Sequence, residues 1–347
     1  MFHGSLLIIP PFCRTLLHKN RFFVQKCGLC LICRNFHGIL CVKTGKNFRL
    51  YKPKLIQFAI RKAVLSMNSL RFTHTKPVIC VGGFSPEKLK QTADAGFSAV
   101  EVGFSQLATF SEEQMDEYLA LLTQNRLTPV AANGFFGIDL GTFFDGYFDI
   151  GKTREYIARA FERTRKIHFE SISFGSGYMR RIPDGYDRER AKEVFVGLLS
   201  EEVVPMLEKY DARLNIEELQ ASETNFINTC KEAAEIAQAV NHPRVGVLCD
   251  FYHMTMSGET AADVPDFAKY VGHVHLASPT SSRSIPYETD GDDAAYRAFL
   301  KALAENGFDG RFSAEGGVAG DRDFAAALKE CYTYMEALLM PYEGKKA

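Results

Sequence analysis

Three carboxylates and one imidazole lie at the ends of short apolar runs in the second half of the chain. They belong to Glu217, Asp250, His275 and Glu315, and the steps between them are 33, 25 and 40 residues. A strand, a helix and their loops occupy roughly 30 residues or more, so this spacing places each side chain at the end of a successive strand. Three oxygen donors and one imidazole nitrogen suit a hard divalent ion such as Mn²⁺ or Mg²⁺. The pattern therefore predicts one metal ion bound by these four residues, and a metalloenzyme.

The elements that must position these side chains alternate between strand-like and helix-like segments from residue 76 onward. Ser85 with Pro86, and Ser111 with Gln114, have the residue types that begin helices. Pro205 is expected to kink or split the helix in which it lies. The predicted strands are Pro77–Gly83, Ser98–Val102, Thr128–Ala132, Glu170–Phe174, Leu214–Glu217, Val245–Asp250, Val271–Leu276 and Arg311–Glu315, and further helices are predicted over 152–167, 188–209, 224–240, 292–306 and 321–337.

This alternation is typical of parallel strands joined by helical crossovers. Val245–Asp250 and Val271–Leu276 are apolar on both faces, as expected for strands covered by helices. An open doubly wound sheet is the competing architecture, but Val81-Gly82-Gly83-Phe84 does not fit the glycine-rich turn that binds dinucleotides. Eight units within residues 76–342 match the length of a (β/α)8 TIM barrel, about 250 residues. We therefore predict an α/β fold of this kind, with its chemistry at the C-terminal strand ends.

The first part of the chain has a different composition from the rest. Residues 1–66 hold twelve Lys or Arg and no Asp or Glu, and the first acidic residue is Glu87. The remaining residues contain 29 basic and 42 acidic side chains, a net formal charge of −13. A basic leader can be an organelle transit peptide or a signal peptide. The third alternative, which we favour, is an upstream extension that does not belong to the fold, because a sequence of ordinary composition begins at Met67. We predict that residues 1–75 form a poorly structured basic extension outside the fold.

The nine cysteines fall into two groups. Cys80, Cys230, Cys249 and Cys331 stand singly in apolar surroundings, which is typical of buried thiols in a reducing compartment, so we expect a cytoplasmic location. The sequence has no uninterrupted run of about 18 apolar residues, so we expect no membrane span. The others lie in the basic extension, where their spacing is compatible with a zinc or iron–sulfur site or with no metal site at all: Cys13, Cys27, Cys30, Cys33 and Cys41, with His37.

Three segments around the proposed ligands resemble one group of enzymes. Ile216–Asn225 (IEELQASETN) resembles a segment of ketose 3-epimerases and hydroxypyruvate isomerases, in which a metal-binding Glu is followed six residues later by a second Glu and then Thr-Asn. Gly246–Met254 (GVLCDFYHM) resembles their Asp-x-x-His-Met segment, and Gly272–His275 resembles their Gly-His-x-His segment. Over residues 76–340 the chain is thus similar to the xylose isomerase-like barrel superfamily.

The resemblance implies a role for each of the four candidate ligands. Glu217, Asp250, His275 and Glu315 would bind one divalent ion, with Mn²⁺ favoured over Mg²⁺ or Co²⁺. Such an ion polarises a substrate carbonyl, makes the neighbouring C–H acidic and stabilises the resulting ene-diolate. In the epimerase relatives the residues matching Glu217 and Glu315 also transfer the proton, from opposite faces of the substrate.

Three further residues are predicted to bind the substrate. Glu223 would hydrogen-bond a substrate oxygen, and the alternative is that it caps helix 224–240. His253 would contact a substrate oxygen or else be a hydrogen-bonded core histidine. Arg283 matches a substrate-contacting Arg or is a solvated surface residue. His273 shares a strand face with the ligand histidine one layer deeper, and is predicted to support it.

Two loops are candidates for setting substrate choice. Asn133–Ile150 holds six aromatic residues, which either wall a sugar pocket or pack in the core or in a dimer contact. Gly175–Asp187 contains Arg180 and Arg181, which either recognise a phosphate or carboxylate or are solvated. Glu218 and Gln220 replace residues usual in the epimerases, so the loops depart from that pattern more than the ligands do.

Together these features predict a divalent-metal-dependent sugar isomerase or epimerase that acts on a ketose, a ketose phosphate or a cyclitol ketone. The main alternative is a metal-dependent lyase or dehydratase of a ketocyclitol or a 3-keto-glycoside, because the same deprotonation can expel a leaving group. An endonuclease-IV-like nuclease is disfavoured by the charge of −13, which suits phosphate backbones poorly. A noncatalytic binding barrel would bind no metal. We expect a small carbohydrate substrate and no nucleic-acid or membrane partner. The chain is either a monomer or a homo-oligomer, since the relatives that it resembles often form dimers or tetramers.

Overall fold

The fold is taken from a computed structural model that describes residues 30–32, 40–44, 47–51, 71–82, 85–137, 140–144, 146 and 148–343, with side chains from residue 71 onward. The chain divides into two units, Met1–Ser69 and Leu70–Ala347. In the first unit, three antiparallel strands form a sheet: β1 (Cys30–Ile32), β2 (Leu40–Thr44) and β3 (Asn47–Tyr51). The side chains of its cysteine cluster lie outside the described residues, and the domain boundary after residue 75 stays a prediction.

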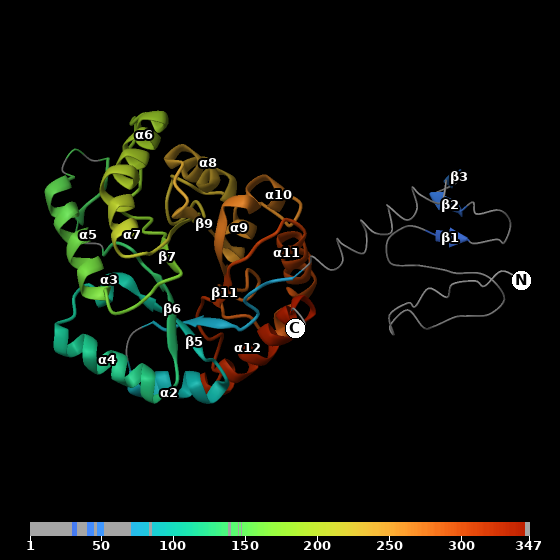
Figure 1. Cartoon of the computed structure of the whole chain (residues 1–347), viewed down its shortest axis with the longest axis horizontal. Helices are drawn as coiled ribbons and strands as arrows, with labels where there is room; N and C mark the ends of the chain where they lie inside the picture. Colours follow the sequence, from blue (N-terminus) through green and yellow to red (C-terminus); the bar gives the residue numbers. More distant parts are fainter. Residues whose placement is uncertain are drawn as a thin grey trace, which may run out of the picture. The chain divides into compact units, whose positions relative to one another are not determined.

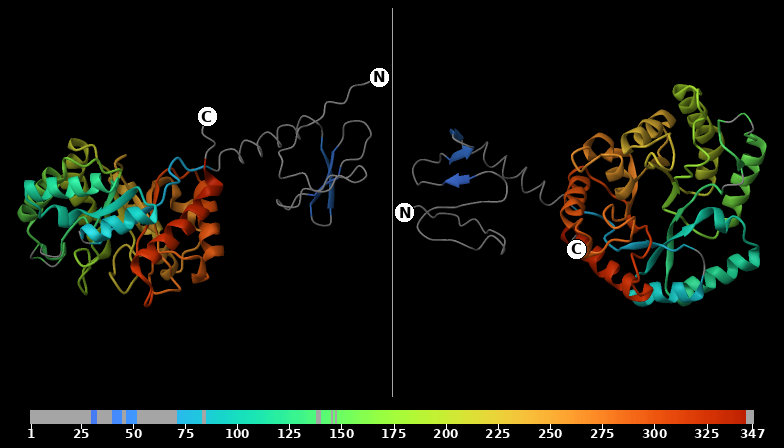
Figure 2. Two further views of the ribbon diagram at one scale, coloured as in Figure 1. Left: turned by 90° about the horizontal axis from the view of Figure 1, so that it is seen from below. Right: turned by 180° about the vertical axis from the view of Figure 1, so that it is seen from behind.

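Eight parallel strands of the second unit close into a barrel, and helices surround it (Figures 1 and 2). The order around the barrel is β10-β11-β4-β5-β6-β7-β8-β9, with β9 paired to β10. This confirms the predicted (β/α)8 architecture. The strands are β4 (Val78–Cys80), β5 (Ala99–Gly103), β6 (Thr128–Asn133), β7 (Ser171–Phe174), β8 (Leu214–Glu217), β9 (Val245–Asp250), β10 (Val271–Leu276) and β11 (Arg311–Ala314).

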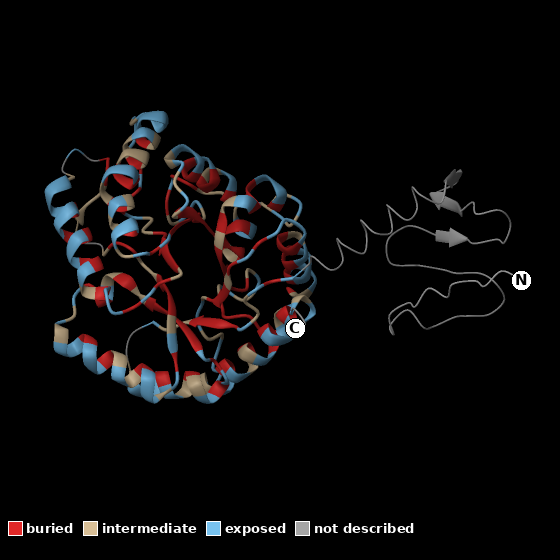
Figure 3. Cartoon of the chain, viewed as in Figure 1, coloured by how far each residue is buried: buried red, intermediate tan, exposed pale blue. Residues whose placement is uncertain are grey.

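The helices of this unit lie outside the barrel and bury one face against it (Figure 3). None of the helices in the described part of the chain is long and apolar enough to cross a bilayer. They are α2 (Pro86–Ala95), α3 (Phe104–Leu107), α4 (Glu112–Gln124), α5 (Ile150–Thr164), α6 (Arg188–Leu198), α7 (Val204–Lys209), α8 (Cys230–Val240), α9 (Phe251–Met256), α10 (Val264–Phe267), α11 (Asp293–Glu305) and α12 (Phe324–Leu339).

The helix starts read from the sequence are confirmed where capping residues mark them. The Ser85 side chain accepts a hydrogen bond from the backbone of Lys88, and Pro86 occupies the first helical position of α2. Ser111 and Gln114 form a reciprocal capping box at the start of α4. Each cap satisfies backbone N–H groups that have no partner within the helix.

Two helices differ from the expected ranges for local reasons. The helix predicted over 188–209 is divided by a π-helical segment, Leu199–Val203, just before Pro205, which has no N–H to continue the α-helical pattern. The helix predicted over 224–240 begins only at Cys230, after an N-cap at Thr229. Ile227 has a φ of 63°, a left-handed conformation that a β-branched residue in a helix does not adopt, so the segment before Thr229 is a loop.

Phe72 joins the segment before β4 to the barrel. Its ring is 3% exposed, lies 4.8 Å from the ring centres of Phe312 and Tyr342, and lies 5.8 Å from that of Phe308. Its backbone N–H also donates to the carbonyl of Tyr342. This aromatic cluster ties the segment that enters the first barrel strand to the C-terminal end of the chain.

Candidate metal centre

Four consecutive barrel strands bring the predicted ligands together. Glu217 ends β8, Asp250 ends β9, His275 lies near the end of β10, and Glu315 follows β11 directly. One donor atom of each lies within 4.8 Å of the donor atoms of the other three. The parallel register explains this, because His275 is paired with Asp250 across neighbouring strands and all four strands end on the same side of the barrel.

His275 lies at the centre of this group. Its Nδ1 atom is 3.5 Å from Glu217 Oε1, 3.8 Å from Asp250 Oδ2 and 3.3 Å from Glu315 Oε2. His275 and Asp250 are completely buried. Nδ1 of His275 and Oδ2 of Asp250 have no hydrogen-bond partner among the described residues, and such buried polar atoms cost about 1–3 kcal/mol each if nothing satisfies them. The four donors therefore fit a divalent ion.

The neighbouring backbone fixes the orientation of Asp250. Its Oδ1 atom caps α9 by accepting hydrogen bonds from the N–H of Tyr252 at 2.7 Å and of His253 at 3.3 Å. Its own N–H donates to Glu218 Oε1 at 2.9 Å. One carboxylate oxygen is thus held by the helix start, which leaves Oδ2 facing the other candidate ligands.

The predicted catalytic carboxylates have different proton affinities. Burial, together with the nearby Glu315 and Asp250, raises the pKa of Glu217 despite the opposing effect of the His275 imidazole. Burial also opposes ionisation of Glu315, but His275 and Arg283 hold its pKa well below the usual value. The pKa of His275 is raised because Glu101 and Glu315 outweigh its burial. Without an ion, Glu217 is the more readily protonated member of the pair.

Arg283 and Glu223 meet at the mouth of this cluster. Arg283 donates to Glu315 Oε2 at 2.8 Å and to Glu223 Oε1 at 3.2 Å, and its guanidinium lies 5.4 Å from the ring centre of Tyr252. The Gln220 side-chain amide donates to Glu223 Oε1 at 3.2 Å and to the Tyr252 hydroxyl at 3.0 Å. The Arg283 side chain is 29% exposed, so it is held within this network rather than freely solvated.

The structure also places the two remaining residues with open alternatives. Glu223 does not cap a helix, because Thr229 is the N-cap of α8, so that alternative is wrong. His253 is completely buried, and its Nδ1 accepts a hydrogen bond from the Gln220 backbone at 3.2 Å. Its Nε2 has no hydrogen-bond partner in the described part of the chain and lies 3.9 Å from Asp250 Oδ2. This imidazole N–H therefore faces the metal centre.

The two loops considered for substrate choice contribute mainly packing. Arg180 is completely buried, its pKa is lowered to about 10 by burial, and it donates to the carbonyls of Phe174 at 3.4 Å and Ile227 at 3.5 Å. Arg181 donates to the Glu223 carbonyl at 2.9 Å. In the loop Asn133–Ile150, the described aromatic side chains contact one another edge to face and are buried or partly buried. They are Phe135, Phe136, Phe143, Phe144 and Phe148. This favours a role in packing over an open wall that binds a sugar.

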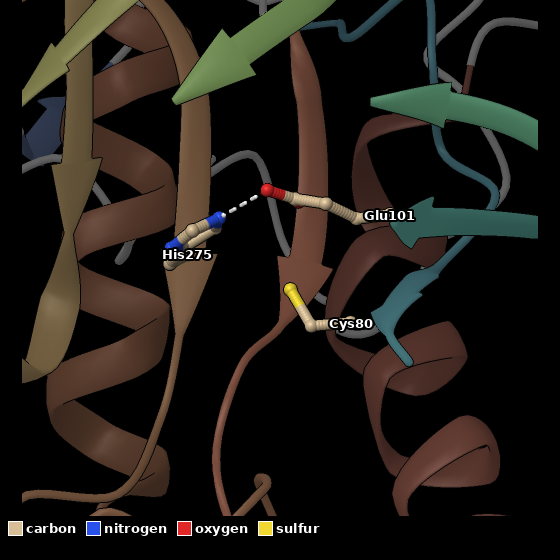
Figure 4. Close-up of side chains that lie close together, drawn as sticks. All are labelled: Cys80, Glu101 and His275. Carbon is tan, nitrogen blue, oxygen red and sulfur yellow. Dashed lines mark hydrogen bonds and ion pairs between the residues drawn. The ribbon is translucent and has the colours of Figure 1, made fainter. Parts of the chain in front are cut away.

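Glu101 is a site residue that the sequence did not reveal. It lies within β5, is completely buried, and its Oε1 is 3.0 Å from His275 Nε2 (Figure 4). The one available signal was a carboxylate inside the apolar run Ala99–Gly103. Cys80 lies beside both residues, but burial raises the pKa of its thiol well above the usual value, so the protonated sulfur is a poor metal ligand.

A second buried group also combines a carboxyl with thiols. Glu218, Cys230 and Cys249 have donor atoms within 4.8 Å of one another. Burial raises the pKa of all three groups, to about 12 for Cys249, so the two thiols remain protonated at neutral pH and are poor ligands. The group formed by Glu217, Asp250, His275 and Glu315 is therefore the better ligand set.

Comparison with known proteins finds relatives that are similar in sequence to most of the barrel. A putative hydroxypyruvate isomerase from Mus musculus is 27% identical over 253 residues, which cover 68% of this chain and 85% of the relative. A D-psicose 3-epimerase from Ruminiclostridium cellulolyticum is 24% identical over 206 residues, 57% of this chain and 67% of the relative.

Solved structures show the same fold. A D-psicose 3-epimerase from Clostridium cellulolyticum H10, determined with D-tagatose, aligns with a TM-score of 0.61 at 18% identity, covering 77% of this chain and 98% of that one. A 3-keto-D-glucoside 4-epimerase from E. coli aligns with a TM-score of 0.62 at 19% identity, covering 76% and 99%. The family model described as the xylose isomerase-like TIM barrel matches residues 89–331, and the chain therefore belongs to that family.

Proposed function

We propose that this chain is a divalent-metal-dependent isomerase or epimerase that moves a proton at the carbon next to a carbonyl of a ketose, a ketose phosphate or a cyclitol ketone. The main support is the convergence of Glu217, Asp250, His275 and Glu315, with two buried donor atoms that lack partners among the described residues. Relatives named as a hydroxypyruvate isomerase and as 3-epimerases support the same class of reaction.

The metal would be held by these four residues. Three carboxylates and one imidazole form an oxygen-rich set, for which we propose Mn²⁺, with Mg²⁺ or Co²⁺ as alternatives. When bound, such an ion polarises the substrate carbonyl and thereby acidifies the neighbouring C–H.

The chain's own carboxylates would then move the proton. Glu315, which accepts a hydrogen bond from Arg283, would take the proton from the substrate. Glu217, the carboxylate on the other side of His275, would return a proton. The two come from β8 and β11, at opposite ends of the four-strand arc that carries the ligands, so each would approach the substrate from its own side.

Three residues would orient the substrate for this transfer. The unpartnered Nε2–H of His253 is available to a substrate oxygen. Arg283 and Glu223 form the polar edge through which a sugar would enter, and their mutual hydrogen bond can be exchanged for bonds to hydroxyl groups. We propose a small carbohydrate substrate and a cytoplasmic location, the latter in keeping with four free cysteines in the described part of the chain.

The proposal is tested by following hydrogen exchange at carbon. The full-length protein, with its metal content measured, is incubated in D₂O with a panel of ketoses, ketose phosphates, cyclitol ketones and 3-keto-glycosides. We expect deuterium in at least one recovered sugar of otherwise unchanged mass, and a loss of about 10²–10⁴ in rate for Glu217→Gln or Glu315→Gln. Glu113→Gln, an exposed change on α4, serves as the control.

Two outcomes would contradict the proposal. Absence of deuterium from every compound in the presence of stoichiometric metal would exclude proton transfer on these substrates. A product lighter than the substrate by its leaving group would instead identify the lyase or dehydratase alternative, for which the buried aromatic loop no longer supplies support.

A further inference from the structure

Glu101 reaches the metal centre from the other side of the barrel. It lies on β5, which is separated from β11 by β4 and is not one of the four strands that carry the candidate ligands. Its side chain is completely buried, and it points toward His275 inside the barrel (Figure 4). The Glu101 Oε1 to His275 Nε2 distance of 3.0 Å is a hydrogen-bond distance.

This contact determines which nitrogen of His275 can bind a metal. Glu101 Oε1 also accepts a hydrogen bond from the Ser173 hydroxyl, and as an acceptor it requires that Nε2 of His275 carry the hydrogen between them. In a neutral imidazole the other nitrogen then has a free lone pair. That nitrogen, Nδ1, is the atom within 3.3–3.8 Å of the three ligand carboxylates and without a hydrogen-bond partner among the described residues.

Glu101 is itself held in place by neighbours within the barrel. Its Oε2 lies 3.0 Å from His273 Nε2, and its Oε1 accepts a hydrogen bond from the Ser173 hydroxyl at 3.2 Å. His273 Nε2 also lies 2.8 Å from the Ser313 hydroxyl. The carboxylate is thus fixed in orientation by contacts on both of its oxygens.

Stability of the fold alone does not account for this carboxylate. Interior positions of TIM barrels are usually filled by Val, Ile or Leu. Removing a carboxylate from water costs several kcal/mol, and pairing with neighbours often does no more than offset that cost. A charged side chain at this position therefore suggests a role in the site that it contacts.

We propose that Glu101 is a positioning residue for the metal centre. By accepting the hydrogen bond from Nε2 of His275, it directs the Nδ1 lone pair toward the ion shared with Glu217, Asp250 and Glu315. Partners of this kind orient metal-binding imidazoles and raise their basicity. The inference rests on the proposed function, since it concerns the same metal centre.

The test compares metal affinity and histidine tautomer in full-length variants. Mn²⁺ is titrated calorimetrically into chelator-treated wild type, Glu101→Gln and Glu101→Leu. We expect about 10–100-fold weaker binding for Glu101→Leu. Glu101→Gln should lose less, because its amide oxygen can still accept from His275. Glu101→Gln also keeps the size of the side chain, so it can still be measured if Glu101→Leu does not fold.

Histidine nitrogen NMR on the Mg²⁺-loaded proteins supplies a signal that general destabilisation would not change. In the wild type we expect Nε2 of His275 to carry the hydrogen and Nδ1 to be unprotonated, and Glu101→Leu should lose this defined state. Leu89→Ala, a buried change on α2, is the control that lowers stability without altering metal affinity or tautomer.

The results separate the two proposals. Wild type and both Glu101 variants with equal Mn²⁺ affinity and the same His275 tautomer would overturn the positioning role while leaving the proposed function intact. A wild-type protein that binds no divalent ion would overturn the proposed function, and this inference with it.

Discussion

Replacing Asp250 with Asn separates metal binding from folding. The substitution retains an oxygen that can cap α9, as Oδ1 now does for the N–H groups of Tyr252 and His253. It replaces Oδ2, the unpartnered atom that faces the other ligands, with an amide that cannot bind a cation. The change therefore removes one ligand charge with little change in shape.

The structure predicts opposite effects with and without metal. Carboxylate oxygens less than 4.8 Å apart repel one another by roughly 3 kcal/mol per pair at an effective dielectric constant of about 20, partly offset by His275 and Arg283. The metal-free Asp250→Asn protein should thus be at least as stable as wild type. With Mn²⁺ at 100 times the dissociation constant, wild type gains about 2.7 kcal/mol. A variant that binds about 100-fold more weakly gains only about 0.4 kcal/mol at that concentration.

Thermal unfolding with and without Mn²⁺ measures both effects. For a domain of this size, the wild-type gain corresponds to a Tm increase of roughly 5–10 °C, which Asp250→Asn should largely lose. Asp187→Asn makes the same chemical change at the exposed N-cap of α6 and should leave the Mn²⁺ response unchanged. An equal metal-dependent increase in wild type and Asp250→Asn would refute the ligand assignment.

Three more predictions follow from contacts around the barrel. Arg283→Lys keeps the positive charge but loses the forked contact that includes Glu223, so kcat/KM in the exchange assay should fall by about tenfold while Tm changes little. Lowering the pH should weaken Mn²⁺ binding by up to about tenfold per pH unit, because the pKa of His275 is raised and the ion must displace its proton. Calorimetry at several pH values measures this dependence, and an affinity that does not change with pH would contradict the prediction. Arg311 donates two hydrogen bonds to Glu170, of 2.6 and 2.7 Å, and lowers the pKa of Glu170. The pair therefore stabilises the fold at a pH above the unfolded-state pKa of Glu170. This stabilisation is lost as the pH falls through the lower pKa that Glu170 has in the folded protein. Glu170→Gln should then cost about 1 kcal/mol or less in urea unfolding at neutral pH, since Glu170 is more than a third exposed, and the difference should shrink in acid.

The four candidate ligands could be found from the sequence because barrel geometry makes their positions predictable. Parallel strands end on the same side of a closed barrel, so residues at four successive strand ends must approach one another whatever the intervening loops do. Glu217, Asp250, His275 and Glu315 required only that the strand ends be located, and short apolar runs locate them well.

Glu101 could not be found in this way because its contacts are not local. The residues that it joins, His273 and His275, are more than 170 positions away in the chain. Its own segment, Ala99–Gly103, has the composition of an ordinary strand, and which face points into the barrel depends on register. A carboxylate within an apolar strand indicated that Glu101 is buried, but it did not indicate which residues Glu101 contacts.

Loop residues were harder to predict because their conformations depend on the barrel beneath them. Glu218 replaces residues usual in the epimerases and proves to be completely buried, where it accepts the backbone N–H of Asp250. Arg283 reaches the site from a left-handed backbone conformation with a φ of 59°, which residue type alone does not indicate. Asn228 donates to the carbonyls of Leu219 and Thr224, which holds the segment before α8 as a loop.

The charges around His275 give an independent reason to expect a cation. Four carboxylates are buried or nearly so at this end of the barrel: Glu101, Glu217, Asp250 and Glu315. Protonated His275 and Arg283 are the cationic groups in contact with the three carboxylates among the candidate ligands. With all four carboxylates ionised and His275 protonated, this group has an excess of two negative charges in a region that water screens poorly, which adds to burial in raising the pKa of Glu217. A divalent ion that displaces the His275 proton reduces this excess to one negative charge, so metal binding should lower the pKa of Glu217 toward the carboxylate range, whereas a barrel that only binds sugars would gain nothing from concentrating these charges.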